Sequence, residues 1–245
     1  MINDKVAFII SMYDEYEIVL KTLNAIVTQY KDPIIIVVRS DNGEEKNEWT
    51  SIKQLATKSI ILPNLASKYH RFILPAYAVT RNFSKGFSLL HEKVEYIVAL
   101  LGDTLIYNPK PLHSMATKMI QRKKYLCCCN AYDQYFHAKE STPEKIIASR
   151  YQGSDTTDFS AVLFILDGKK FQQTKCFTDI KVINDFSSEQ CLGDETLKHF
   201  SKKEILLKTI ILNAKKKYFF YSFMDGIYSF TNGITYHAGT GKPGR

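Results

Sequence analysis

Aspartate residues stand at the ends of three apolar runs in the sequence. They are Asp14 in "SMYDE", Asp41 in "RSDNG" and Asp103 in "GDTLI". A carboxylate at the end of a buried strand is either a turn residue or a ligand for a cation. Asp103 by itself does not distinguish a turn residue from a cation ligand. The choice depends on the helices and strands predicted around it.

Apolar runs of strand length recur through the first two thirds of the chain. They are continuous rather than alternating, which is typical of strands covered on both faces. The runs occupy 6–10, 34–38, 59–62, 96–101, 125–129 and 161–166. Helical spacing of apolar residues lies between them, in 15–30, 76–91 and 112–120. Alternating strands and helices predict an α/β fold, a mostly parallel central sheet flanked by helices.

Open sheets of this kind bind ligands beyond the carboxyl ends of their strands, which is where the three aspartates lie. Asp14 and Glu17 resemble a capping box at the start of the first helix. The last third of the sequence has a more irregular pattern, and we expect it to form the acceptor side of a site whose first half is the sheet. No linker divides the chain, which predicts a single domain over 1–245.

Composition and charge are those of an ordinary globular protein that attracts anions. Of the 245 residues, 45% are hydrophobic and 24% charged, and the formal net charge is +8. Three short clusters contribute to it: "QRKK" at 121–124, "SKK" at 201–203 and "KKK" at 215–217. Such clusters are solvated faces or surfaces for anions such as nucleotide diphosphates or acidic lipids. We expect no nucleic acid partner, because no recognition motif accompanies the charge.

The cysteines and the N-terminus indicate a cytoplasmic protein. The five cysteines are odd in number and three are consecutive, at 127–129, which suits neither a disulfide framework nor a Cys-x-x-Cys metal site. We expect reduced core residues. The first apolar run, at 6–10, is too short for a signal peptide or a membrane span. The expected location is the cytosol, with peripheral contact at an anionic membrane surface.

The order of these features resembles the GT-A glycosyltransferases, in particular the large inverting family that includes polysaccharide synthases. "VAFIISMYDEYEIVLKTLNAI" is similar to the first strand, the Pro-x-Tyr-Asn-Glu-like turn and the helix of that family. "IIIVVRSDNG" is similar to its second strand, and "AVTRNFSKGFSLL" to its Ala-Arg-Asn-x-Gly helix start. "GDTLIYNPKPL" stands where the family has its Asp-x-Asp motif, with Leu101 in place of the first acid. The resemblance spans roughly residues 5–200.

This resemblance implies a nucleotide-sugar donor and a divalent cation. The leaving diphosphate gains negative charge, which Mg²⁺ or Mn²⁺ stabilises while bound to carboxylate oxygens. Asp103 is the metal ligand that the resemblance implies, and the change to Leu101 removes the usual ribose contact. Asp41 is the matching residue for the nucleotide base, a uracil-like one, and Tyr13 stacks on that base or touches its edge. The alternative for Asp41 and Tyr13 is a surface turn.

Two further pairs could serve the reaction. Arg81 and Lys85 lie one turn apart near the start of a predicted helix and could face a phosphate or the sugar; the alternative is a pair of solvated cations. "CLGDETLKHF" resembles the acidic pair that supplies the general base of inverting enzymes, which takes the proton of the acceptor hydroxyl. The alignment favours Glu195, and a one-residue shift favours Asp194. An acidic first turn of a helix is the structural alternative.

The tail "YHAGTGKPGR" contains His237 and Lys242 among glycines. It resembles the His-x-x-Gly-x-x-Lys-Pro ending of a retaining family, one residue shorter, in which the His is a metal ligand and the Lys binds the diphosphate. A disordered C-terminus is the alternative.

The sequence therefore predicts a GT-A glycosyltransferase that uses Mn²⁺ or Mg²⁺ and a nucleotide-sugar donor, with UDP favoured. Residues 1–130 would bind the donor and metal, and 131–245 would bind a glycan or lipid-linked acceptor and form a C-terminal lid. Inversion is preferred, and retention remains an alternative. Two other classes are a sugar-phosphate nucleotidyltransferase, although "SMYDEYE" lacks its glycine-rich loop, and an inactive basic binding module.

Overall fold

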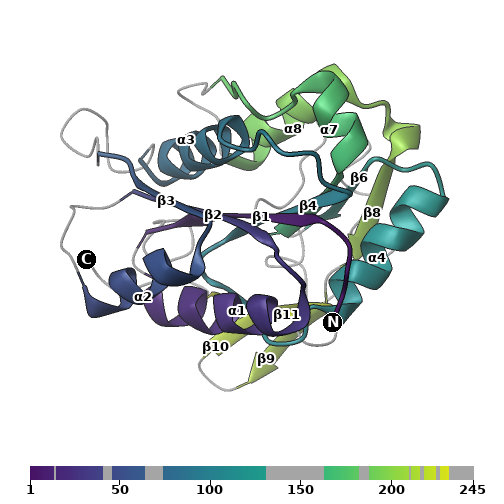
Figure 1. The fold of residues 1–245 in the computed structure, drawn as a ribbon. Coiled ribbons are helices and arrows are strands. Elements are labelled where there is room, and N and C mark those ends of the chain that lie inside the picture. The colour runs from purple at the N-terminus through teal and green to yellow at the C-terminus, as the bar shows by residue number, and fades with distance from the viewer. Residues whose placement is uncertain are drawn as a thin grey trace.

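The computed structural model describes most of the chain, in segments. These are residues 1–13, 15–40, 46–63, 74–130, 163–181, 188–209, 211–215, 218–224 and 227–231. They form two sheets and the helices that pack on them (Figure 1).

Seven strands form the larger sheet, in the order β3-β2-β1-β4-β7-β6-β8. The strands are β1 (Val6–Met12), β2 (Ile34–Arg39), β3 (Lys58–Ile61), β4 (Tyr96–Leu101), β6 (Leu126–Asn130), β7 (Leu163–Asp167) and β8 (Ile205–Thr209). Strands β3, β2, β1 and β4 are mutually parallel, β6 and β8 are parallel, and β7 runs antiparallel to β4 and β6. The predicted α/β fold with a mostly parallel sheet is confirmed.

Helices cover both faces of this sheet. They are α1 (Tyr16–Gln29), α2 (Asn47–Leu55), α3 (Leu74–Ser88), α4 (Lys110–Gln121), α7 (Gly168–Thr174) and α8 (Ser188–His199). In Figure 1, α3, α7 and α8 lie above the sheet and α1 and α2 below it. Alternate β1 residues enter opposite cores: Phe8 and Ile10 face the α1 side, and Ala7 and Ile9 face the α3 side.

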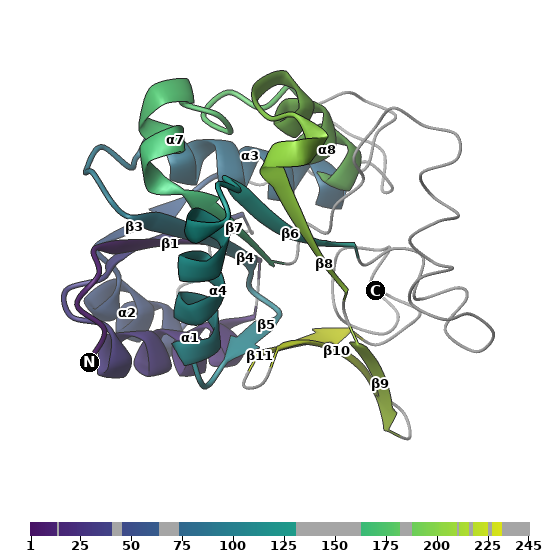
Figure 2. The same cartoon turned by 90° about the vertical axis from the view of Figure 1, so that its right-hand side faces the viewer.

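The smaller sheet is antiparallel and joins distant parts of the sequence. Its strands, in the order β5-β11-β10-β9, are β5 (Thr104–Ile106), β11 (Ile227–Thr231), β10 (Tyr218–Met224) and β9 (Ile211–Lys215). Figure 2 shows this sheet beneath the larger one, with the β9–β10 hairpin extending from the body. A short 3₁₀ helix, η1 (Lys202–Glu204), precedes β8.

Two sequence expectations need correction. The N-cap of α1 is Glu15, which makes no side-chain capping bond, whereas the sequence suggested Asp14, which lies outside the described residues. The last third of the chain, expected to be irregular, contributes four strands, β8 to β11, and residues on both sides of position 130 share both sheets. The assignment of roles to 1–130 and 131–245 remains a prediction.

Candidate functional site

The carboxyl ends of β1, β2 and β4 meet at one rim of the larger sheet, which we call the carboxyl edge. It comprises residues 11–13, 39–40 and 101–103. The Ser40 N–H donates to the Met12 carbonyl at 3.1 Å, and the Gly102 N–H donates to the Ser11 carbonyl at 2.7 Å. These backbone hydrogen bonds hold together the three segments that follow β1, β2 and β4, as expected because the three strands are parallel and adjacent.

Asn82 of α3 ties the helix to the carboxyl edge through its side chain. The Ser40 hydroxyl lies 2.5 Å from Asn82 Oδ1, which accepts its hydrogen bond. Asn82 Nδ2 donates to Ser11 Oγ at 3.2 Å and approaches the Met12 carbonyl at 3.5 Å. The Asn82 side chain is buried, so losing it would leave buried polar partners unsatisfied. It therefore fixes α3 against the ends of β1 and β2.

Arg81, predicted to bind a phosphate or the sugar, lies beside this network. One guanidinium nitrogen, Nη2, donates to the Pro63 carbonyl at 2.7 Å and to Ser40 Oγ at 3.2 Å. Its side chain is half-buried, and Lys85, one turn further along α3, is exposed. The structure thus holds Arg81 at the carboxyl edge and leaves Lys85 one turn away from it.

Glu15 brings a second carboxylate to the carboxyl edge, where it lies against Gly102, the residue before Asp103. Its Oε2 accepts the Tyr13 N–H at 2.8 Å. A Cβ atom added to Gly102 would come within 2.7 Å of the same oxygen, so the carboxylate lies against that glycine. Sequence reasoning treated Glu15 only as part of a turn and missed its position. The signal was the glutamate that ends the Pro-x-Tyr-Asn-Glu-like turn.

Asp103 lies in the turn between β4 and β5 and is half-buried. Strand β5 pairs with β11, with Thr104 opposite Ser229. Strand β11 runs antiparallel to β5 and continues to Thr231, beyond the level of Thr104. The C-terminal end of β11 therefore lies at the Asp103 end of β5.

A buried cation at the end of β2 also escaped sequence reasoning. Arg39 is fully buried, with its guanidinium carbon 5.0 Å from the centroid of the Trp49 ring and 5.3 Å from that of Tyr16. The Lys46 amino group lies 4.7 Å from the same Tyr16 centroid. Aromatic faces attract cations at these distances. Positive charge is thus held where β2 ends, next to Ser40.

Comparison with known proteins supports a fold assignment. The sequence matches no protein-family model and no curated protein. Glucosyl-3-phosphoglycerate synthase from Mycobacterium tuberculosis in complex with UDP superposes with a TM-score of 0.52 at 12% identity, over 87% of this chain and 73% of that chain. The same enzyme with Mg²⁺ and UDP gives a TM-score of 0.51 at 12% identity, over 84% and 69%. The chain has the GT-A fold.

Another GT-A structure, apo mouse xyloside xylosyltransferase 1, is less similar. It gives a TM-score of 0.44 at 9% identity, over 85% of each chain.

The acidic pair predicted to contain the general base lies on α8 of this GT-A chain. The Glu195 side chain is only 8% exposed, and its oxygens contact Lys198 Nζ at 2.9 Å and His199 Nε2 at 3.1 Å. Asp194 is half-buried. The structure therefore ties Glu195 to its own helix, and the choice of base remains a prediction.

Carboxylate oxygens at the carboxyl edge suit a hard divalent cation. Among the residues that the structure describes, no group of three His, Cys, Asp or Glu side chains is arranged to hold a metal. Asp103 and Glu15 supply two carboxylates on adjoining segments, a donor set that fits Mg²⁺ or Mn²⁺ when phosphate oxygens and water complete the coordination. Three predicted site residues, Asp41, His237 and Lys242, lie outside the described residues.

Proposed function

We propose that this protein is a glycosyltransferase that moves a sugar from a nucleotide-diphosphate donor, with a UDP-sugar favoured, to a hydroxyl of a glycan or lipid-linked acceptor. One observation carries the proposal: in this GT-A fold the Glu15 carboxylate lies against Gly102, the residue before Asp103, at the carboxyl ends of β1, β2 and β4. A synthase with the same fold has been solved with Mg²⁺ and UDP. Open α/β sheets bind nucleotides beyond the carboxyl ends of their parallel strands, which is where Asp103 and Glu15 lie.

Asp103 and Glu15 would hold a Mg²⁺ or Mn²⁺ ion and the donor between them. When bound, the ion supplies positive charge to the departing diphosphate oxygen. Asp103 takes the ligand role, and Glu15 provides the carboxylate that Leu101 lacks, directed at the ribose or sugar. Gly102 permits this arrangement, because any side chain there would meet the Glu15 oxygen.

Cations and an aromatic ring would position the rest of the donor. The Arg81 guanidinium is held at the carboxyl edge by Ser40 and Pro63, where its charge would attract a phosphate, and Lys85 offers a second charge one turn away. Tyr13 lies at the end of β1 and would contact the nucleotide base together with Asp41. Arg39 adds positive charge to this end of the sheet without contacting solvent.

The tail would complete the site from the other side. Five residues separate Thr231, at the Asp103 end of β5, from His237, and the six steps between these two positions span at most about 22 Å. We propose that His237 joins Asp103 on the metal and that Lys242 binds the diphosphate.

In the transfer, the acceptor oxygen bonds to the anomeric carbon as the bond from that carbon to the diphosphate oxygen breaks. The proton of the acceptor hydroxyl passes to a carboxylate. We propose Asp194 or Glu195 for this role and inversion of the anomeric configuration. Because Glu195 is bonded to Lys198 and His199, Asp194 is the more accessible of the two. Retention is the alternative that the tail pattern favours.

A thermal-shift screen of UDP and nucleotide sugars, with and without Mn²⁺, tests the proposal. A ligand that binds the folded state at about 100 times its Kd adds about 2.7 kcal/mol of stability. We expect a shift with UDP and Mn²⁺ that EDTA removes. Asp103→Asn should abolish the shift and lower turnover by about 10²- to 10³-fold.

Asp32→Asn is the matched control, since Asp32 is exposed in the loop before β2 and its φ of 51° suits asparagine. This variant should behave as wild type. Full turnover of a nucleotide sugar by Asp103→Asn in the presence of EDTA would show that the proposal is wrong. An absence of any shift with every nucleotide diphosphate would favour the inactive binding module.

A further inference from the structure

Two basic clusters that lie far apart in the sequence become one surface in the fold. Strands β6 and β8 are parallel neighbours, with Leu126 opposite Ile205. The residues just before them are held together by a hydrogen bond from the Tyr125 N–H to the Glu204 carbonyl at 2.8 Å and by one from Lys124 Nζ to the Lys203 carbonyl. "QRKK" and "SKK" therefore lie side by side, although about eighty residues separate them.

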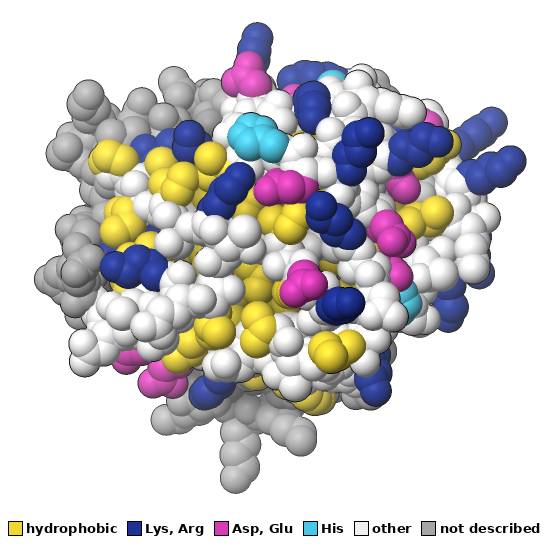
Figure 3. Space-filling view, in the orientation of Figure 1, with side chains coloured by type: hydrophobic (Ala, Val, Ile, Leu, Met, Phe, Trp, Pro, Cys, Tyr) yellow, Lys and Arg dark blue, Asp and Glu magenta, His cyan; other side chains and the backbone are white. Residues whose placement is uncertain are grey.

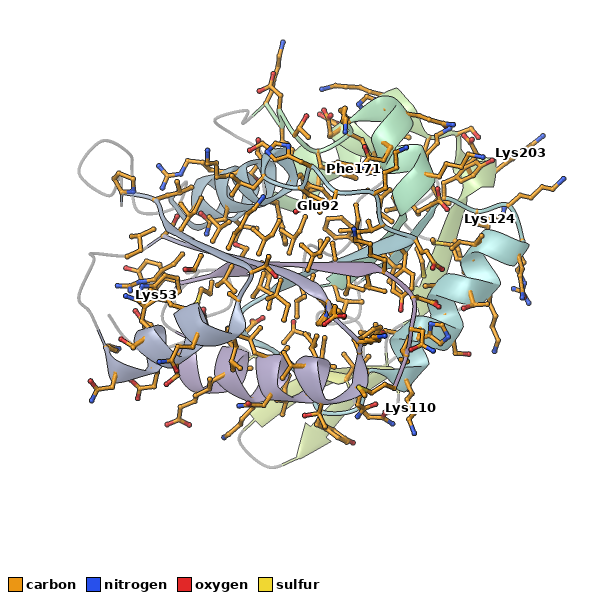
Figure 4. All side chains as sticks on the ribbon, in the orientation of Figure 1. Lys53, Glu92, Lys110, Lys124, Phe171 and Lys203 are labelled. Atoms are coloured by element: carbon orange, nitrogen blue, oxygen red, sulfur yellow. The ribbon has the colours of Figure 1, made fainter. Side chains whose placement is uncertain are left out.

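The start of α7 adds to this surface. The Asp167 N–H donates to the Tyr125 carbonyl at 2.8 Å, which places the first turn of α7 beside the end of α4. We call the combined surface the basic edge. Its members are Arg122, Lys123, Lys124, Lys169, Lys170 and Lys203. Figure 4 shows Lys124 and Lys203 near one another at this end of the molecule, and Figure 3 shows dark blue side chains over the same region.

The acids at the basic edge are already engaged. Glu204 lies 3.2 Å from Lys170 Nζ and accepts hydrogen bonds from the Ser201 N–H and hydroxyl at 2.8 and 2.9 Å. Asp167 accepts the Lys170 N–H at 2.6 Å as the N-cap of α7. No Asp or Glu occurs between Asp103 and Asp133, a stretch that includes all of α4. No ion pair joins the remaining lysines or Arg122 to an acid among the residues that the structure describes, so the basic edge carries a net positive charge.

An apolar side chain lies among these cations. Ile120, in the last turn of α4, is 40% exposed, and the exposed residues around it on the helix are Lys118, Gln121 and Arg122. Lysines around an exposed apolar residue are typical of proteins that lie on anionic bilayers, where the charges meet phosphate groups and the apolar group enters the interface. Nucleic acid is less favoured, since Arg122 is the one arginine of the basic edge as described.

We propose that the basic edge docks the protein on an anionic phospholipid bilayer. Among the described residues no helix is long and apolar enough to cross a membrane. The basic edge lies at the starts of β6 and β8, and Asp103 lies at the end of β4, whose start at Tyr96 is level with Asp167. Docking therefore leaves the carboxyl edge at the far end of the strands, about 20 Å from the lipid surface.

Co-sedimentation with vesicles tests this proposal. The probe is phosphatidylcholine vesicles with about one third phosphatidylglycerol, against phosphatidylcholine alone. We expect binding only to the anionic vesicles, weakened by a roughly tenfold increase in salt. Arg122→Gln with Lys203→Gln should reduce the partition coefficient roughly thirtyfold, since each cation near the surface contributes about fivefold. Ile120→Ser should reduce it further, by several-fold.

Lys21→Gln with Lys53→Gln is the matched control, because it removes the same charge from α1 and α2, and Figure 4 shows Lys53 at the other end of the molecule. An equal loss of binding in this control would overturn the proposal, since net charge alone would then explain it. So would equal binding to both kinds of vesicle, or salt-sensitive binding to a DNA duplex without binding to vesicles. The assay needs no donor, so its outcome is independent of transferase activity.

Discussion

Side-chain hydrogen bonds link neighbouring elements at both ends of the strands in the seven-stranded sheet. The side chains that form these bonds differ in chemistry between the two ends. At the carboxyl edge, the Asn82 amide and the hydroxyls of Ser11 and Ser40 form a neutral network, with charged side chains beside it. At the opposite rim, the amino edge, the network itself consists of titratable groups.

That second network begins with two phenols. The hydroxyls of Tyr30 and Tyr96 are 2.9 Å apart, Tyr96 is 3.4 Å from His113 Nδ1, and His113 is 3.0 Å from Asp4. A neutral scaffold keeps its hydrogen bonds as pH changes, whereas the phenol network does not. The carboxyl edge is thus held together by groups that do not titrate, and the amino edge by groups that do.

Substitution of one glycine at each edge should give the largest effects that distinguish the carboxyl edge from the amino edge. A Cβ on Gly102 would meet the Glu15 carboxylate at 2.7 Å and Met12 Cβ at 2.9 Å, and a Cβ on Gly168 would meet the Val94 backbone carbonyl. Gly102→Ala should lower transfer by about a hundredfold, because it displaces a carboxylate of the site. Gly168→Ala should cost about 1–3 kcal/mol of stability and leave UDP affinity unchanged.

Steady-state kinetics, UDP titration and denaturant unfolding separate the two effects. If Gly168→Ala reduced UDP affinity as strongly as Gly102→Ala, the two edges would not be functionally distinct.

Removal of the carboxyl-edge network should affect both stability and donor binding. Asn82→Ala leaves the Ser40 and Ser11 hydroxyls without their buried partner, which should cost about 1–3 kcal/mol in urea unfolding. Donor affinity should fall as well, since Ser40 also positions Arg81. Ser88→Ala, an exposed change at the other end of α3, serves as a control and should stay within about 0.5 kcal/mol of wild type. A stable Asn82→Ala with normal affinity would contradict the scaffold role.

Alkaline pH should affect the amino edge. Burial raises the pKa of Tyr30 from 10.0 to about 12 and raises that of Tyr96 further. The folded state then keeps protons that the unfolded state releases, so the stability from this pair is present below pH 10 and is lost as pH rises toward the folded pKa. The free energy of unfolding should fall over this range, and Tyr30→Phe with Tyr96→Phe should flatten the slope. An unchanged slope in the double variant would refute the assignment.

The smallest effect should come from Glu204. Hydrogen bonds from the Ser201 N–H and hydroxyl, with Lys170 nearby, hold the pKa of this carboxyl below its ordinary value of 4.5. Its contribution is therefore present above that value and is lost as pH falls through the lowered pKa. Glu204→Gln should cost about 0.5–1 kcal/mol at neutral pH and nothing at strongly acidic pH. Thermal unfolding at the two pH values measures the difference, and an equal cost at both would rule out the ionic contribution.

The local pattern of apolar residues was sufficient to predict the helices and strands in the first half of the chain. Buried strands such as β1 and β4 read as continuous apolar runs, and α1 and α3 show helical spacing, so both kinds of element were predicted within a few residues of their bounds. Four of the five cysteines are described as free and buried, as expected.

Long-range pairing was not visible in the sequence. The contact of β5 with β11 joins Thr104 to Ser229, and no local signal marks it. The burial of Arg39 depends on Trp49 and Tyr16 from two other elements. Likewise the Glu15 carboxylate reaches Gly102, the residue before Asp103, because β1 and β4 are neighbours. Asp41, His237, Lys242, the acceptor role of residues 131–245 and the cytoplasmic location remain predictions.

The β5–β11 pairing also constrains how the protein can be made. Strands β1 to β4 are synthesised early, but among the described residues the partner of β5, the strand after Asp103, is β11, which is translated much later. N-terminal regions fold first during synthesis. Nascent chains would therefore hold an ordered core while the turn that contains Asp103 still lacked the strand pairing that follows it, and this turn would become fixed only when β11 pairs with β5.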